Sequence, residues 1–169
     1  MNNLDSHEKE YQVNHLLFFS INDSEERKEF CKNIFMETWY LIPEDYKGKI
    51  LTNLDFIIFK NVEDFYHDDT LGCALLNKIN FRCFVIFNPF TNLIERETKI
   101  HILAHELAHV YYNHPFHGFN KGSEEKTYIN EIAEPQAYDL TENIWKILPN
   151  PDDICKLPKY KQYVLSKRQ

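Results

Sequence analysis

The chain has 169 residues, which suits one domain, and its formal net charge is −7 because 26 acidic residues outnumber 19 basic residues. This balance argues against nucleic acid or an anionic membrane as the main partner, because phosphate contacts need clustered lysine and arginine. Hydrophobic residues make up 43% of the chain, which is enough to bury a core. Neither GxGxxG nor GxxxxGK[ST] occurs, which excludes the glycine-rich phosphate loops.

No segment has the pattern of an export signal or of a membrane span. The first ten residues are polar and net acidic, and the apolar run at 16–19 is shorter than the roughly 7–15 residues that a secretory signal needs. The four cysteines are scattered without a CxxC pair. Cys73 and Cys83 could face each other across a hairpin, but free thiols fit a chain without an export signal better. These features predict a cytoplasmic protein without a membrane partner.

The first quarter of the chain predicts an irregular lead-in followed by one helix. Residues 1–22 show no regular pattern. Asp23 with Glu26 forms a capping-box pattern, which predicts a helix over about 24–40. We expect this helix to end before Pro43, since proline interrupts helical hydrogen bonding.

The middle of the chain predicts a small sheet and then a long helix. The segment at 54–60, LDFIIFK, is rich in apolar and β-branched residues and is typical of a strand. Two apolar runs within 72–87, separated by NKIN, favour a β-hairpin. Asn92 with Glu95 is a second capping-box pattern, and the apolar spacing after it predicts a helix to about His114.

The last part of the chain predicts a loop, a helix and a tail. Residues 115–127 contain proline, two glycines and several charges, which is typical of a loop. A long helix is expected over about 129–148, followed by a basic tail. We therefore expect a single α+β domain over 1–169 with its core at about 50–148. A small mixed or antiparallel sheet would pack on the helix that ends near 114 and on the last helix.

The strongest chemical signal is the HExxH motif His105-Glu106-Leu107-Ala108-His109. Residues i and i+4 share one face of a helix, so both imidazoles can bind one metal ion at about 2.0–2.1 Å. Zinc lowers the pKa of the water that it binds to about 7. Glu106 lies one residue past the first histidine, where it can take a proton from that water. The motif therefore predicts a zinc centre in which His105 and His109 are ligands and Glu106 is the general base.

A catalytic zinc site usually has a third protein ligand, and several residues are candidates. The segment Glu134-Pro-Gln-Ala137 matches the ExxA pattern that gluzincins place on a second helix, which makes Glu134 the leading candidate. Glu131 is the first alternative, and His114 and His117 are close in sequence but off the register of the extended metzincin motif. Pro135 is unusual inside a helix. Either the helix starts near Glu134, with the proline in its first turn, or it kinks there.

Other polar side chains are expected near the motif. His101 precedes His105 by four residues and shares its face, so we expect it to be exposed or to lie behind the ligands. Asp139 does not share the face of Glu134 and is interpreted as a surface carboxylate. Packing is the expected role of the nearby tyrosines, although one of them could hydrogen-bond the oxyanion of a tetrahedral intermediate. These tyrosines are Tyr111, Tyr112, Tyr128 and Tyr138.

Over about residues 72–142 a series of features occurs in a specific order. A glycine, Gly72, precedes the hairpin, the strand CFVIFNP ends in Asn88, and ERET, ILAHELAH and EPQA follow. In this order the segment resembles the ImmA/IrrE-type metallopeptidases. The resemblance implies a core similar to thermolysin-type gluzincins, with a small sheet over the motif helix and the third-ligand helix beside it.

The same resemblance implies a function. It assigns zinc binding to His105, His109 and Glu134 and the general base to Glu106. Members of the family cut transcriptional repressors, so the expected activity is zinc-dependent endopeptidase cleavage of a protein substrate, with a repressor as one candidate. Two alternatives stay open: a zincin-scaffold protein that binds its partner without cutting, such as an antirepressor or inhibitor, and a protease that acts on a host component.

Overall fold

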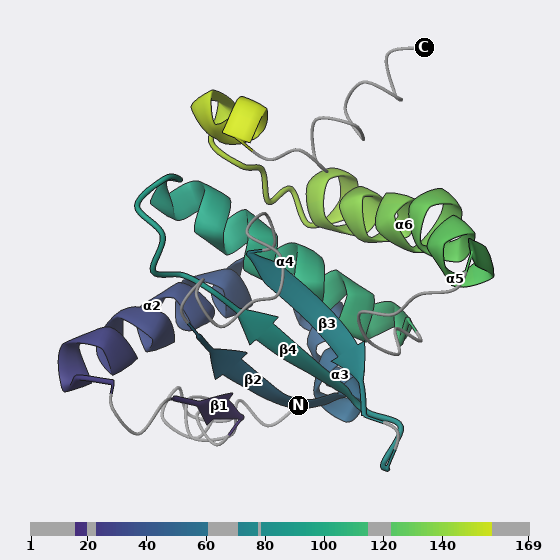
Figure 1. The fold of residues 1–169 in the computed structure, drawn as a ribbon, viewed down its shortest axis with the longest axis horizontal. Coiled ribbons are helices and arrows are strands. Elements are labelled where there is room, and N and C mark those ends of the chain that lie inside the picture. Colours follow the sequence, from purple (N-terminus) through teal and green to yellow (C-terminus); the bar gives the residue numbers. More distant parts are fainter. Residues whose placement is uncertain (1–15, 20–22, 61–70, 78, 115–122, 157–169) are drawn as a thin grey trace.

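The computed structural model describes residues 16–19, 23–60, 71–77, 79–114 and 123–156. Within them the fold is mixed α+β, as expected, with helices packed around one four-stranded sheet (Figure 1). The strands are β1 (Leu17–Phe18), β2 (Leu54–Phe59), β3 (Gly72–Leu76) and β4 (Cys83–Phe87). The α-helices are α2 (Glu25–Leu41), α3 (Glu44–Asn53), α4 (Arg96–Tyr112), α5 (Ser123–Tyr128) and α6 (Glu134–Tyr138).

The sheet is mixed and has the strand order β1-β2-β4-β3. The strands β1, β2 and β4 run parallel, and β3 pairs antiparallel with β4, which confirms the predicted strand and hairpin. Cys73 pairs with Ile86 and Cys83 with Leu76, so the two cysteines do not face each other. All four cysteines are free thiols.

Two short elements were not expected. The strand β1 lies within residues 1–22, where an irregular lead-in was predicted, and it pairs with β2. Two residues are too few to show the alternation that identifies a strand. The helix α3 starts directly after Pro43, which ends α2 and occupies the position before the first turn of α3. A proline there fits because the first helical N–H groups need no partner within the helix.

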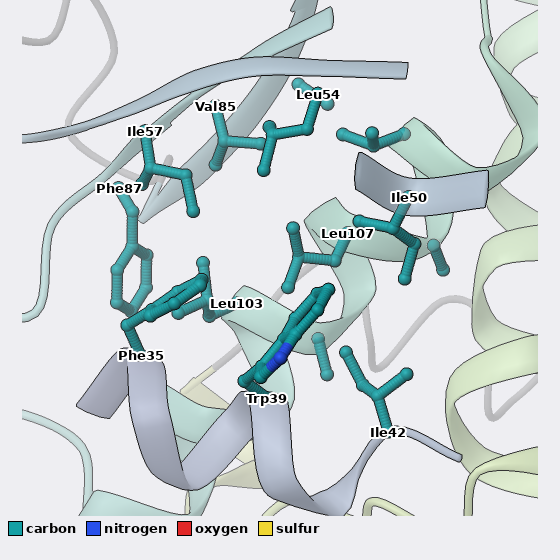
Figure 2. Close-up of a cluster of buried hydrophobic side chains, with 14 of the residues drawn as sticks. Phe35, Trp39, Ile42, Ile50, Leu54, Ile57, Val85, Phe87, Leu103 and Leu107 are labelled. Carbon is teal, nitrogen blue, oxygen red and sulfur yellow. The ribbon is translucent and has the colours of Figure 1, made fainter. Parts of the chain in front are cut away.

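One face of the sheet carries the main core (Figure 2). On this face, side chains of α2, α3 and α4 pack against the inward-facing side chains of β2 and β4. The almost completely buried residues of this core include Phe35, Trp39, Ile50, Leu54, Ile57, Val85, Phe87, Leu103 and Leu107. Each such side chain contributes about 1.5–3 kcal/mol relative to an exposed one. This core surrounds the middle of α4, and it includes α2 residues that precede position 50. The extent of the domain stays a prediction.

The helix α4 is buried on nearly every side. From Thr98 to Val110 every residue except Ile102 is buried. A helix that is enclosed in this way cannot slide or rotate without disturbing the core on several sides. The histidines of the HExxH motif are therefore carried on one of the most constrained elements of the fold.

The predicted capping residues of the two long helices are wrong, although α2 (Glu25–Leu41) lies close to the expected 24–40. In α2 the cap is Ser24, whose hydroxyl accepts a hydrogen bond from the N–H of Arg27, and not Asp23. In α4 the first turn begins at Arg96, and the residue before it, Glu95, makes no side-chain cap. The capping box that was expected between Asn92 and Glu95 is therefore absent from the start of α4.

The N-terminus of α4 is capped instead by Asp153, from a short 3-10 helix at Pro151–Lys156. One carboxylate oxygen of Asp153 accepts hydrogen bonds from the Glu95 N–H at 2.7 Å and from the Thr98 hydroxyl at 2.6 Å. The other oxygen accepts from the Lys156 ammonium at 2.8 Å. Burial by itself raises the pKa of Asp153, but these hydrogen bonds lower it overall, below its usual value of 3.8.

We expect Asp153→Ala to lower the free energy of unfolding by about 3 kcal/mol, because buried donors lose a charged acceptor. Asp152→Ala is the matched control, since that neighbouring carboxylate is exposed and its loss should cost little. Because the folded-state pKa is depressed, the stabilisation is complete above pH 3.8 and is lost as the pH falls through the folded-state value. Urea unfolding as a function of pH measures both effects; equal losses in the two variants would contradict this role.

The last helical segment begins earlier and ends earlier than predicted. It runs from Ser123 to Ile144 and not over 129–148. The residues 123–127 of the predicted loop are therefore helical, and the residues 115–122 lie outside the described part of the chain. Among the residues that the structure describes, no helix is long and apolar enough to cross a membrane.

Candidate metal centre

Two histidines of α4 and one glutamate of α6 converge on one point. The Nε2 atoms of His105 and His109 lie 3.1 Å apart, and the Oε2 atom of Glu134 lies 3.1 Å from the first and 3.9 Å from the second. The two helices lie side by side (Figure 1). Among the described residues this is the one group of three or more His, Cys, Asp or Glu side chains found to be able to hold a metal ion.

The spacing of these three atoms suits a tetrahedral zinc ion. With bonds of about 2.0–2.2 Å, the ligand atoms of a tetrahedral zinc site lie about 3.3–3.6 Å from one another. The observed separations of 3.1, 3.1 and 3.9 Å lie on both sides of this value. A single proton on His105 Nε2 would have to be shared between the His109 nitrogen and the Glu134 oxygen, whereas a cation between them satisfies all three. The donor set therefore fits the predicted ion.

Glu134 reaches this point because the helix before it is widened. Residues Ile129–Ala133 form a π-helical turn, in which the N–H of Glu134 bonds to the carbonyl of Ile129. A second π-helical turn, Asp139–Ile144, follows α6. Proline lacks an N–H and clashes with the carbonyl four residues earlier, so a π turn directly before Pro135 relieves the clash. Helical structure is continuous from Ser123 to Ile144, but its α-helical part α6 begins at Glu134 with Pro135 in the first turn, which agrees with one of the two expected outcomes. The π-helical turn before it was not expected.

The other candidates for the third ligand are placed differently. Glu131 is exposed and is not part of the converging group. His114 lies behind His109, on the side of the ring away from Glu134, with the two Nδ1 atoms 2.8 Å apart. His117 lies outside the described residues. The arrangement thus favours Glu134, and its role as a ligand stays a prediction.

Glu106 lies on α4 beside the edge strand of the sheet. Its side chain is 8% exposed. A Cβ atom built on Gly72, the first residue of β3, would lie 2.8 Å from Glu106 Cγ and 3.0 Å from its Oε1. Only glycine lets the strand pass this close to the carboxylate without displacing it. The candidate general base is therefore next to the strand along which an extended peptide could lie.

His101 and Tyr138 lie along the same interface between α4 and the last helical segment. His101 is buried, and its Nε2 is 3.3 Å from Oε1 of Glu142, so of its two expected positions, exposed or behind the ligands, the exposed one is wrong. Burial lowers the pKa of His101. The ring of Tyr138 packs on that of His105, with 4.1 Å between their centroids. Among the described residues, no hydrogen bond is found for His105 Nδ1, so packing orients this side of the ring.

His114, which the sequence indicated as a candidate third ligand, and Gln136, which the sequence did not indicate, lie next to each other beside the site. His114 is 2% exposed, and burial lowers its pKa. Its Nε2 lies 3.1 Å from Oε1 of Gln136 on α6, and its ring stacks on that of Tyr112. The pair thus connects His109 with the helix that carries Glu134. Asp139 is exposed, as expected.

No protein-family model matches this chain, and no curated protein or solved structure is significantly similar to it. The resemblance to ImmA/IrrE-type metallopeptidases, and the zincin-like packing that it implies, therefore stay predictions.

Proposed function

We propose that this protein is a zinc-dependent endopeptidase that hydrolyses peptide bonds of a protein substrate. The observation that carries the proposal is the convergence of three donor atoms, from His105, His109 and Glu134, within 4.8 Å of one another. A motif on an exposed helix would not bring a carboxylate from a separate helix to the same point. In its most specific form the proposal names a transcriptional repressor as the substrate, as the family resemblance implies.

Each residue of the site has a defined task in the proposed reaction. When bound, zinc supplies a Lewis acid that lowers the pKa of a water molecule and polarises the peptide carbonyl. His105, His109 and Glu134 hold and orient the ion through Nε2, Nε2 and Oε2. The carboxylate of Glu106 takes the proton from the attacking water and passes it to the nitrogen of the leaving amine. The buried position of Glu106 limits its contact with bulk solvent.

The substrate would lie along β3, the edge strand of the sheet that the described residues form. An edge strand offers unpaired N–H and C=O groups to an extended peptide. Gly72 and Ala74 of β3 face α4, while Cys73 and Leu75 face the other side of the sheet, where Leu75 packs against Ile129 and Ala133. A peptide paired at this edge would pass beside Glu106.

The close approach of Gly72 to Glu106 gives a test of this arrangement. Gly72→Ala should lower peptidase activity about 100-fold, because the added methyl displaces the carboxylate. Its free energy of unfolding should fall by about 1–3 kcal/mol, because the methyl crowds Glu106 and Ile102, while the backbone is not strained since Gly72 does not have a positive φ. Gly48→Ala in α3 is the control, because its Cβ would meet nothing within 4 Å. Peptidase assays and urea unfolding compare the two variants. Equal peptidase activity of Gly72→Ala and Gly48→Ala would exclude the close approach of Gly72 to Glu106.

The function itself is tested with a peptide library and the zinc-loaded full chain. Mass spectrometry should reveal new N-termini that appear with zinc, disappear with a chelator and return when zinc is restored. Retention of intact partner in a stable complex, with no cleaved peptide from the library, would instead identify a protein that binds without cutting. Cleavage that persists in the metal-free protein would contradict the proposed mechanism.

A further inference from the structure

On one side of the candidate metal centre, His109, His114 and Gln136 form a row of contacts that the proposed reaction does not use. His109 turns Nε2 toward Glu134 and His105, and its Nδ1 lies 2.8 Å from Nδ1 of His114. His114 in turn approaches Oε1 of Gln136 at 3.1 Å through its own Nε2. The row ends two residues from Glu134 on the same helix, α6.

The positions of the hydrogens in this row follow from its last member. The carbonyl oxygen of Gln136 can only accept, so the proton of neutral His114 is on Nε2 and its Nδ1 carries a lone pair. That lone pair accepts the N–H of His109 Nδ1. The Nε2 of His109 then has no proton and presents its lone pair where a metal would bind. The reverse direction would place the proton on His109 Nε2 and block the site.

A turn at the end of α4 brings the two histidines together. Asn113 adopts the left-handed conformation, with φ 53° and ψ 47°. The N–H of His114 then bonds to the carbonyl of His109 at 3.1 Å, and the N–H of Asn113 bonds to the carbonyl of Val110 at 3.0 Å. This is a Schellman motif, which folds the residue after the turn back over the last turn of the helix. Asn53 anchors the same end by donating to the carbonyl of Val110 at 3.0 Å.

We propose that His114, held by Gln136, is a positioning residue that fixes the tautomer and orientation of His109 for metal binding. The inference rests on the metal site of the proposed function and deepens it. A ligating histidine commonly donates its second N–H to a carboxylate or carbonyl, and loss of such a partner costs about 10–100-fold in metal affinity. Here the acceptor for the N–H of His109 is the neutral imidazole of His114. It also connects the ends of the two helices that supply the ligands.

The test compares two variants of His114 by their affinity for Zn²⁺ alone, measured by competition with a chromophoric chelator. His114→Phe keeps a flat ring against Tyr112 but removes the acceptor, so zinc affinity should fall about 10–100-fold. His114→Asn places an amide oxygen near the former Nδ1 position, so affinity should stay within about fivefold of wild type. The metal-free variants should unfold at similar urea concentrations, which separates positioning from stability.

A second pair of variants does not touch the buried ring. Gln136 is exposed, so Gln136→Met should fold normally and should weaken zinc binding, whereas Gln136→Glu keeps an acceptor and should not. In the zinc-loaded wild type, ¹⁵N–¹H correlation spectra of the side chains should show a proton on Nδ1 of His109 and on Nε2 of His114.

The outcomes separate this inference from the proposed function. Wild-type protein that binds no zinc would end both. Wild-type protein that binds zinc, with His114→Phe binding equally well, would overturn the positioning role alone. Equal weakening of His114→Phe and His114→Asn, or a proton on Nδ1 of His114, would overturn it as well.

Discussion

Glu106→Gln is expected to keep zinc bound and to lose about 10²–10⁴-fold in kcat, the range attributed to a positioned proton-transfer group. Glutamine has nearly the shape of glutamate but cannot take the proton of the attacking water. The fold should not suffer, because a buried carboxylate, 8% exposed here, is replaced by a neutral amide. Peptide hydrolysis, zinc content and urea unfolding of the same preparation measure the three quantities together.

The control for this substitution is Glu97→Gln on the same helix. Glu97 is exposed in the first turn of α4 and has no place in the site, so its variant should keep full activity. Full activity of Glu106→Gln would refute the assignment of the general base. A loss of both zinc and activity would instead show that Glu106 acts through the metal site.

Glu134→Ala is expected to weaken zinc binding by more than about 100-fold, because a direct ligand should matter more than an outer partner. At a thousandfold excess of zinc over its Kd, the wild type gains about 4.1 kcal/mol, which raises the melting temperature of a chain of this length by about 8–16 °C. The variant should show little of this increase. Titration calorimetry and thermal unfolding with and without zinc provide the measurement.

The matched control is Glu131→Ala, in the same helical segment. Glu131 was the first alternative as a ligand, but it is exposed and lies outside the converging group. We expect its variant to bind zinc as the wild type does. Zinc binding that depends on Glu131 and not on Glu134 would show that the last helix is turned relative to this structure.

The part of the fold that could be predicted is the part in which local pattern and tertiary structure agree. The apolar and β-branched runs of β2 and of the β3–β4 hairpin are strong local signals of strands. The spacing of the apolar residues in α4 is an equally strong signal of a helix. The pairing of His105 with His109 follows from helix geometry alone. The ExxA pattern placed Glu134 near them, although the periodicity of the last helix gave no orientation for its side chain.

What could not be predicted depends on residues that are distant in sequence or on unusual backbone. Asp153 caps α4 across 58 residues from Glu95, so a search for a local capping box found Asn92 instead. For His114 an ordinary helical rotation predicts a position away from His109. The left-handed residue Asn113 reverses the chain and brings His114 back. Asparagine near a helix end is the sequence signal of such a turn.

The π-helical turns are the third such case. Pro135 predicts a helix start or a kink, because proline cannot take part in α-helical hydrogen bonding with the preceding turn. The π-helical turn precedes α6, which begins at Glu134 with Pro135 in its first turn, and Glu134 reaches the two histidines. Its sequence signal is weak, since π turns are rare.

The central claim is that one zinc ion is held by Nε2 of His105, Nε2 of His109 and Oε2 of Glu134. Diffraction from crystals of the zinc-loaded full chain, recorded on both sides of the zinc absorption edge, tests it most directly. We expect one anomalous peak, at about 2.0–2.2 Å from each of these three atoms. Crystals that take up no zinc, or a peak at any other set of side chains, would contradict it.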